Sequence, residues 1–139
     1  MSCGNTNLEE AYRATQYHVY AEPPFTLQVD TFSAPLLACL KAHGAAGGTF
    51  ITAWNPFSQD SARAANEAAN QSLKAELLEL GAVVMPGFGA WPNDPASGEE
   101  SFLAIGLDHD TACRLGRAYR QNAIVTFSSD AVPGLVLLV

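Results

Sequence analysis

The chain has 139 residues, of which 48% are apolar and 15% are charged. A folded chain of this size buries roughly two-thirds of the surface that its unfolded form exposes, which is enough for one hydrophobic core. We therefore expect one compact domain and exclude an intrinsically disordered chain. Fourteen acidic and seven basic residues give a formal charge of −7. This charge repels polyanions, so we expect no nucleic-acid partner.

The N-terminal sequence carries neither a basic region nor an apolar run, and no later stretch approaches the ~20 apolar residues that cross a membrane. We expect a cytoplasmic protein with no membrane partner, in which residues 1–8 form a flexible tail and residues 9–139 form the domain. The three cysteines, Cys3, Cys39 and Cys113, are too widely spaced for a disulfide framework or a metal knuckle. Cys39 and Cys113 are interpreted as small core residues.

The first third of the chain predicts a hairpin and a helix. Residues 8–12 favour a short helical turn. Over residues 14–30 apolar and polar residues alternate, with a break at Glu22-Pro23-Pro24, and this pattern predicts a β-hairpin. Ser33 followed by Pro35 is typical of a helix start, and this helix should run through Lys41. Residues 49–54 form an apolar, β-branched run that predicts a central strand, ended by Asn55-Pro56.

The remainder predicts alternating helices and strands. Asp60 or Ser61 should cap a long helix that ends at Gly81. Its expected core stripe consists of alanines and leucines: Ala62, Ala65, Ala69, Leu73, Leu77 and Leu80. Residues 82–85 resemble a strand, the Gly- and Pro-rich stretch 86–98 is interpreted as a loop, and residues 101–107 as a second central strand. Asp108 or Asp110 should cap a third helix, followed by strands over 123–127 and 135–139.

These elements predict an α+β fold, a single-domain sheet with helices packed on it. From Phe50 onward the order is strand, helix, strand, strand, helix, strand (βαββαβ), which is the ferredoxin-like split-βαβ pattern. The preceding β-hairpin and helix should extend or cover this sheet.

Amide side chains gather around the end of the predicted central strand. Asn55 and Ser58 follow the strand, and Asn66 and Asn70 lie on the next helix, on the face that we expect to be buried. A buried amide without hydrogen bonds costs ~1–3 kcal/mol, so each of these side chains needs partners. Two interpretations stay open. The amides either fasten the strand-to-helix turn to the backbone or line a pocket that orients a small polar ligand.

Other residues extend the pocket interpretation. Glu99 and Glu100 precede the second central strand, where desolvation raises the pKa of a carboxyl group. Glu100 is our candidate catalytic acid or base, and the alternative is a solvated charge. Gln121 and Asn122 either close the third helix or point into the same pocket. Trp91, in the expected loop, is a candidate ligand-binding lid residue or an anchor for a protein partner.

The sequence predicts neither a metal site nor a cofactor. Asp108-His109-Asp110 has metal-ligand residue types, but adjacent side chains rarely converge on one ion. Gly87-Phe88-Gly89 lacks the full phosphate-binding glycine pattern and opens no helix. No nucleophile elbow, P-loop or zinc-protease motif occurs in the sequence.

Several short segments together resemble a bacterial protein family: Phe50–Pro56 with Ser58, Asn66 and Asn70, Glu100–Phe102, and Gln121–Ala123. This family is known as domain of unknown function 3293, and the resemblance extends from about Tyr12 to Phe127. It implies that one shared motif set contains Asn55, Asn66, Glu100, Gln121 and Asn122, which favours a common site over independent turn fasteners. The family is uncharacterised, so the resemblance implies no activity.

Three functions are compatible with these residues. We first expect a small binding or regulatory module whose amide-rich cluster holds a small polar ligand or a protein partner. A second hypothesis is a small hydrolase or transferase that uses Glu100 as an acid or base, with the amides positioning the substrate. A third is an acidic interaction protein that neutralises a basic protein partner, which rests on the charge alone. The oligomeric state is not predicted.

Overall fold

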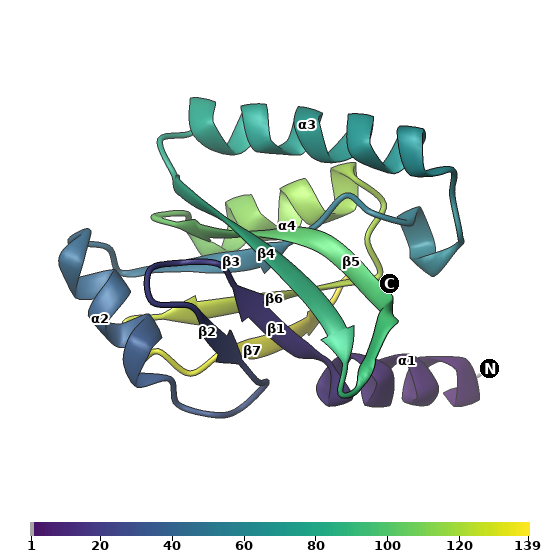
Figure 1. Cartoon of the computed structure of the whole chain (residues 1–139), viewed down its shortest axis with the longest axis horizontal. Coiled ribbons are helices and arrows are strands. Elements are labelled where there is room, and N and C mark those ends of the chain that lie inside the picture. Colours follow the sequence, from purple (N-terminus) through teal and green to yellow (C-terminus); the bar gives the residue numbers. More distant parts are fainter. Residues whose placement is uncertain (1) are drawn as a thin grey trace.

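The computed structural model describes residues 2–139, with side chains from Leu8 onward. Within these residues, four α-helices, one 3-10 turn and seven strands form a single α+β domain, as predicted. The strand order is β2-β1-β4-β5-β3-β6-β7, and every neighbouring pair is antiparallel. The sheet curls, so that β1 and β2 cross in front of the central strands in Figure 1.

The elements follow one another along the chain with short connections. The helices are α1 (Ser2–Ala14), α2 (Ala34–Ala42), α3 (Arg63–Glu79) and α4 (His109–Ala118), and the 3-10 turn η1 covers Pro56–Ser58. The strands are β1 (Gln16–Val19), β2 (Phe25–Leu27), β3 (Gly47–Ile51), β4 (Val83–Trp91), β5 (Asp94–Ile105), β6 (Ala123–Ser128) and β7 (Gly134–Leu137).

Local signals place the starts of α2 and α4, whereas α3 follows Ala62, which makes no side-chain cap, and not the predicted caps Asp60 or Ser61. The Ser33 hydroxyl accepts a hydrogen bond from the Leu36 amide at 3.2 Å, which caps α2 as predicted. Asp108 caps α4 in the same way, because its Oδ1 accepts from the Thr111 amide at 2.7 Å. Gly81, just past α3, has a φ of 84°, which glycine adopts readily. No helix in the described part of the chain is long and apolar enough to span a membrane.

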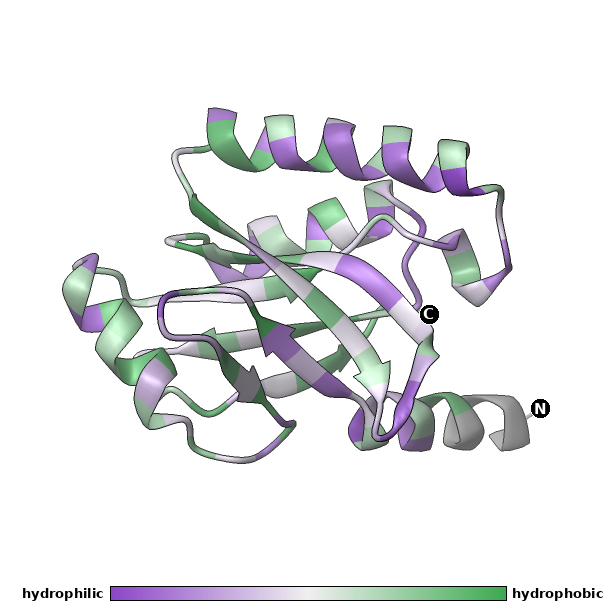
Figure 2. Ribbon diagram, viewed as in Figure 1, coloured by the Kyte–Doolittle hydropathy of each residue, from purple (hydrophilic) through white to green (hydrophobic). Residues whose placement is uncertain are grey.

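Helices cover both faces of the sheet, and each face carries its own core. Helices α3 and α4 pack on one face, and α2 lies against the other together with the curled β1–β2 arm (Figure 1). Successive residues of a strand point to opposite faces. Phe50 therefore enters the α2 core, while Ile51 enters the α3–α4 core. Figure 2 shows that β5 changes from hydrophobic to hydrophilic toward its turn with β4.

The stretch 86–98 is not a loop, and this prediction was wrong. It forms the outer halves of β4 and β5, which pair from Val83↔Ile105 to Trp91↔Asp94. Two of its glycines, Gly87 and Gly98, make room for aromatic rings rather than for a turn. A Cβ on Gly98 would lie 1.9 Å from the Phe88 ring, and one on Gly87 would lie 2.7 Å from the Phe50 ring.

Two further expectations need correction. Helix α1 runs over Ser2–Ala14, where only a helical turn at residues 8–12 was expected. Ala65 in α3 and the flanking residues Ala62 and Leu80 are exposed, so they are not core residues. The buried stripe consists instead of Asn66, Asn70, Leu73 and Leu77. Two amides therefore occupy core positions of α3.

Candidate functional site

A cavity of about 550 Å³ lies at the end of the sheet where β3 passes into η1. Its walls come from α1, from the starts of β1, β5 and β6, and from the end of β4. We call it the Glu99 cavity, after the carboxyl group that lines it. The predicted site residues that line it are Asn55, Ser58, Asn66, Trp91 and Gln121. Asn70, Glu100 and Asn122 lie near it but not on its lining.

Asn55 and Asn66 form a reciprocal pair. The Asn55 amide N–H donates to Asn66 Oδ1 at 2.9 Å, and Asn66 Nδ2 donates to Asn55 Oδ1 at 2.8 Å. Asn55 Oδ1 also accepts from the Ser61 amide at 3.1 Å. The pair therefore ties the start of α3 to the end of the central strand, and both amide oxygens are occupied.

The other predicted amides also bond to neighbouring segments. Asn70 accepts from the Ala53 amide at 2.8 Å and donates to the Glu100 carbonyl at 2.8 Å. Gln121 Nε2 donates to the Trp54 carbonyl at 3.3 Å. Asn122 Nδ2 donates to Ser58 Oγ at 2.9 Å. These contacts fasten the loop after β3, and a direct role of the amides in ligand binding stays a prediction.

The segment Asn55–Ser58 adopts an unusual backbone. Asn55, Phe57 and Ser58 have φ values of 47°, 53° and 60°, in the left-handed region that residues with a Cβ adopt rarely. The Phe57 amide donates to the Arg120 carbonyl at 2.6 Å. Arg120 is itself left-handed, with φ of 59°. Such strain persists only where surrounding contacts enforce it, and it concentrates at functional sites.

Glu99 and Glu100 point to opposite faces of β5. Glu99 lines the cavity, and its Oε2 accepts a long hydrogen bond of 3.4 Å from Asn55 Nδ2. Burial raises the pKa of Glu99 to about 7, the Asn55 bond lowers it, and the nearby Asp60 charge raises it further. Glu100 is exposed and pairs with Arg63 at 3.2 Å.

Sequence reasoning named both glutamates but selected Glu100. The signal that separates them is the period of two along β5. Ser101, Leu103 and Ile105 are buried and share their parity with Glu99. Because the α2 core lies on that face, Glu99 is directed inward, and Glu100 is directed away from the cavity.

Helix α1 forms one wall of the cavity, and side-chain hydrogen bonds to carbonyl groups near its C-terminal end attach it to β1 and β4. Tyr17 Oη donates to the Tyr12 carbonyl at 2.7 Å, and Trp91 Nε1 donates to the Ala11 carbonyl at 3.2 Å. Burial raises the pKa of both Tyr12 and Tyr17, so their hydroxyls stay neutral near pH 7.

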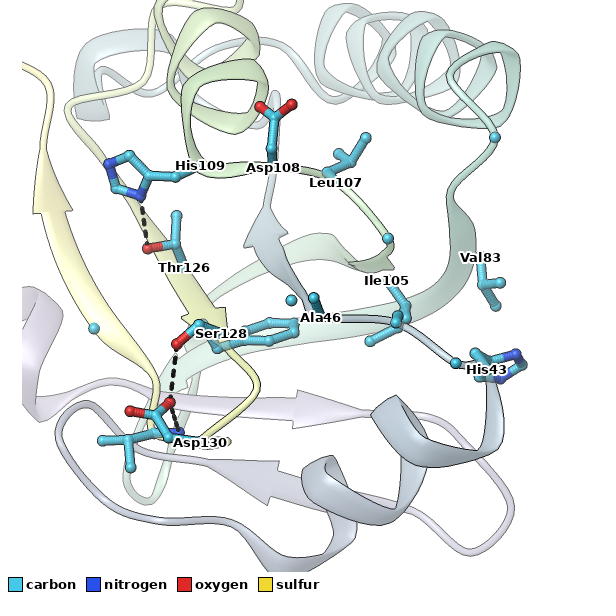
Figure 3. Close-up of a pocket in the computed structure, with 18 residues that line it drawn as sticks. His43, Ala46, Val83, Ile105, Leu107, Asp108, His109, Thr126, Ser128 and Asp130 are labelled. Carbon is cyan, nitrogen blue, oxygen red and sulfur yellow. Dashed lines mark hydrogen bonds between the residues drawn. The ribbon is translucent and has the colours of Figure 1, made fainter.

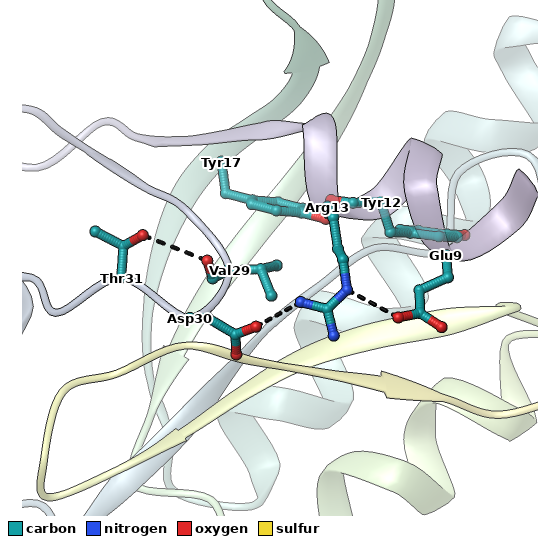
Figure 4. A network of polar contacts seen from close by, with 7 residues as sticks. All are labelled: Glu9, Tyr12, Arg13, Tyr17, Val29, Asp30 and Thr31. Carbon is teal, nitrogen blue, oxygen red and sulfur yellow. Dashed lines mark hydrogen bonds and ion pairs between the residues drawn. The ribbon is translucent and has the colours of Figure 1, made fainter. Parts of the chain in front are cut away.

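Arg13 fixes the same helix from its outer side. Figure 4 shows its guanidinium between Glu9, on α1, and Asp30, after β2. Its Nε lies 2.9 Å from Glu9 Oε2. The α1 residues that line the cavity, among them Tyr12, were missed by the sequence analysis, because no local pattern predicts that α1 folds back onto the sheet.

A second cavity, of about 830 Å³, lies at the opposite end of the sheet (Figure 3). Several of its polar side chains engage one another or the backbone. His109 Nδ1 lies 3.4 Å from Thr126 Oγ1, and Asp130 Oδ1 accepts from the Ser128 hydroxyl at 3.2 Å. Among the side chains that the structure describes, no group of three His, Cys, Asp or Glu residues is arranged to hold a metal ion.

A family model described as "Protein of unknown function (DUF3293)" matches residues 51–124, which are 74 of the 139 residues of the chain. The chain belongs to the DUF3293 family. The DUF3293 segment contains Asn55, Glu99 and the Gln121–Asn122 pair, whereas α1 and β1 lie outside it. No curated protein and no solved structure matches the chain.

Proposed function

We propose that this protein is a small-molecule binding module whose ligand occupies the Glu99 cavity. The observation that carries the proposal is a partly buried carboxyl group that faces a cavity of about 550 Å³ and holds one long hydrogen bond to the side chains that the structure describes. Small-molecule sites have this size and this composition, with an apolar lining and a few converging polar groups.

The lining supports a preformed site. Its inner part is apolar, with Phe50 and Val125 from the central strands, and Trp91 stands at the outer rim. The left-handed loop at Asn55–Ser58 is locked by its bonds to Arg120 and Asn122. A rigid wall reduces the entropy that a ligand loses on binding, because fewer side chains must be ordered.

An enzymatic function is the second candidate. A glutamate with a pKa near 7 can both accept and donate a proton at neutral pH, which suits a hydrolase or transferase. In this candidate Glu99 takes the acid-base role that the sequence analysis gave to Glu100. The ion pair of Glu100 with Arg63 and its exposure favour this reassignment.

The strand order supports the finer fold prediction as well. We propose that the segment from β3 to β6 is a ferredoxin-like split βαβ. Within the sheet these strands lie in the order β4-β5-β3-β6, so β5 separates β3 from β4. That arrangement is the one in which the crossover helix α3 connects two strands that flank a third.

Native mass spectrometry tests the binding function. The protein is purified from its own host cells and compared, intact and denatured, with Glu99→Gln and with Glu79→Gln. Glu79 is an exposed residue at the end of α3, so its variant is a matched control for the loss of one charge. We expect a retained small molecule in the wild type and in Glu79→Gln, and its loss in Glu99→Gln. Equal retention in all three proteins contradicts the assignment to the Glu99 cavity, and a bare protein contradicts the binding function.

A further inference from the structure

We propose that the ligand of the Glu99 cavity is an organic amine in its cationic form, with the ammonium group at Glu99 and an apolar, aromatic-sized body against the strands. This inference rests on the proposed binding function and adds the chemical class of the ligand.

The charges around the cavity favour a cation. Among the described side chains, its charged lining residues are Glu99, Asp60 and Arg63. The Arg63 guanidinium is already paired with two carboxylates that do not line the cavity, since Nε lies 3.2 Å from Glu67 Oε2 and Nη2 lies 3.2 Å from Glu100 Oε2. Two carboxylates thus neutralise the basic group, and the two acidic groups dominate the potential that a ligand meets.

The hydrogen-bond acceptors of the cavity also favour a cationic ligand. The Oδ1 atoms of Asn55 and Asn66 accept bonds from within the protein. Among the side chains from Leu8 onward, Glu99 has one donor partner, at 3.4 Å, for a group that accepts several bonds when ionised. An ammonium group supplies three donors together with a positive charge, and it therefore compensates the desolvation that Glu99 suffers.

The walls suit the remainder of such a ligand. Tyr12 from α1, Tyr17 from β1 and Trp91 at the end of β4 line one side of the cavity, and aromatic rings attract cations through their quadrupole. Phe50 and Val125, which are 4% and 1% exposed, form an apolar floor. The volume exceeds what an isolated ion needs and suits a ligand with an aromatic ring.

The inference predicts how binding depends on pH. A cation requires ionised Glu99, whose pKa is raised to about 7 by burial. From Leu8 onward, Asp60 and Arg63 are the other charged residues that line the cavity. Burial raises the pKa values of Tyr12 and Tyr17, so these hydroxyls stay neutral. The ionised fraction of a group with this pKa increases about tenfold from pH 6 to pH 8. Amine affinity should therefore rise about tenfold over this range.

The test uses three probes with one indole body: tryptamine, tryptophol and indole-3-propionate. They carry an ammonium, a hydroxyl and a carboxylate on the same two-carbon linker, and an aliphatic ammonium stays charged up to about pH 8. Chemical-shift titration of the full chain measures each affinity at about pH 6 and pH 8. We expect only tryptamine to shift the resonances of the cavity, with tighter binding at the higher pH.

Variants connect the effect to the carboxyl group. Glu99→Gln should weaken tryptamine binding at least about tenfold at pH 8 and remove its pH dependence, since a hydrogen bond to a charged group is lost. Glu79→Gln should leave both unchanged. If tryptophol or indole-3-propionate binds as tightly as tryptamine, or if no probe shifts the cavity, the amine assignment is wrong. The binding function is judged separately, by whether native mass spectrometry finds a retained molecule that Glu99→Gln loses.

Discussion

Replacing Glu99 by Gln should stabilise the protein above neutral pH and leave its stability near pH 4.5 unchanged. The pKa of Glu99 is about 7 in the folded protein, against an ordinary value of 4.5. Between these two values the folded state keeps the proton and the unfolded state loses it. The free energy of unfolding therefore falls as the pH rises through this window, by ~1.4 kcal/mol per pH unit.

Raising the pH across this whole interval, from about 4.5 to about 7, lowers the free energy of unfolding by about 3 kcal/mol. Gln cannot ionise and keeps the shape of the protonated carboxyl group, so the variant lacks this loss. In a chain of 139 residues, a difference of this size corresponds to a melting temperature about 10 °C higher for the variant at pH 8.

Urea unfolding of the wild type, Glu99→Gln and Glu79→Gln at about pH 4.5, 6 and 8 measures the effect. We expect the free energy of unfolding of Glu99→Gln to exceed that of the wild type by a margin that grows as the pH rises. Glu79→Gln should show the same pH dependence as the wild type. If Glu99→Gln and the wild type lose stability in parallel, Glu99 is not desolvated as the structure indicates, and the reasoning fails.

Three further substitutions test a contact in the cavity wall, a close approach within the sheet and the attachment of α1. Asn66→Ala removes bonds to Asn55 N and Oδ1 and should cost ~1–3 kcal/mol in urea unfolding, because it leaves the Asn55 amide N–H without its partner. Gly48→Ala should cost at least about 3 kcal/mol in the same assay, since its Cβ would lie 2.1 Å from the Ala104 carbonyl oxygen. Tyr17→Phe should cost ~1 kcal/mol and speed hydrogen exchange at the end of α1, where its hydroxyl bonds a carbonyl.

The chain offers matched controls for two of these changes. Gln71→Ala lies on an exposed position of the same helix as Asn66 and should change the stability by less than about 0.5 kcal/mol. Gly134→Ala has open space, since the nearest atom to its Cβ is 3.8 Å away. A cost equal to that of the test variant, in either pair, contradicts the role assigned to the contact. Unchanged exchange in Tyr17→Phe contradicts the fastening of α1.

Elements with local signals were predictable. Ser33 and Asp108 cap α2 and α4 because a short side chain reaches amides two or three residues ahead, which needs no tertiary contact. Long-range pairing overrode such signals in β4 and β5. Pro86 and the glycines near it disfavour a strand. Strand β1, which is distant in sequence, nevertheless pairs with β4, for example at Tyr17 and Gly89, and this pairing stabilises the extended conformation of β4.

The candidate site was predictable in part for the same reason. The amides near β3 were recognised because buried amides need partners, and the structure brings Asn55, Asn66 and Gln121 to one cavity. The sequence analysis selected Glu100 and not Glu99, whose side chain lines the cavity, because the choice between adjacent glutamates depends on the register of β5. Tyr12 was missed because its position depends on how α1 folds back. The expected flexibility of residues 1–8 stays a prediction.

The bonds between the loop after β3 and the start of β6 bear on the order of folding. Asn122 and Ser58 are 64 residues apart in sequence, and Gln121 and Trp54 are 67 apart. Contacts of such long sequence separation close late, because a long chain segment must be ordered before they contribute. The hairpin of β4 and β5 is local and can form first. We therefore expect the Glu99 cavity to be completed in the last steps of folding, when β6 joins the sheet beside β3.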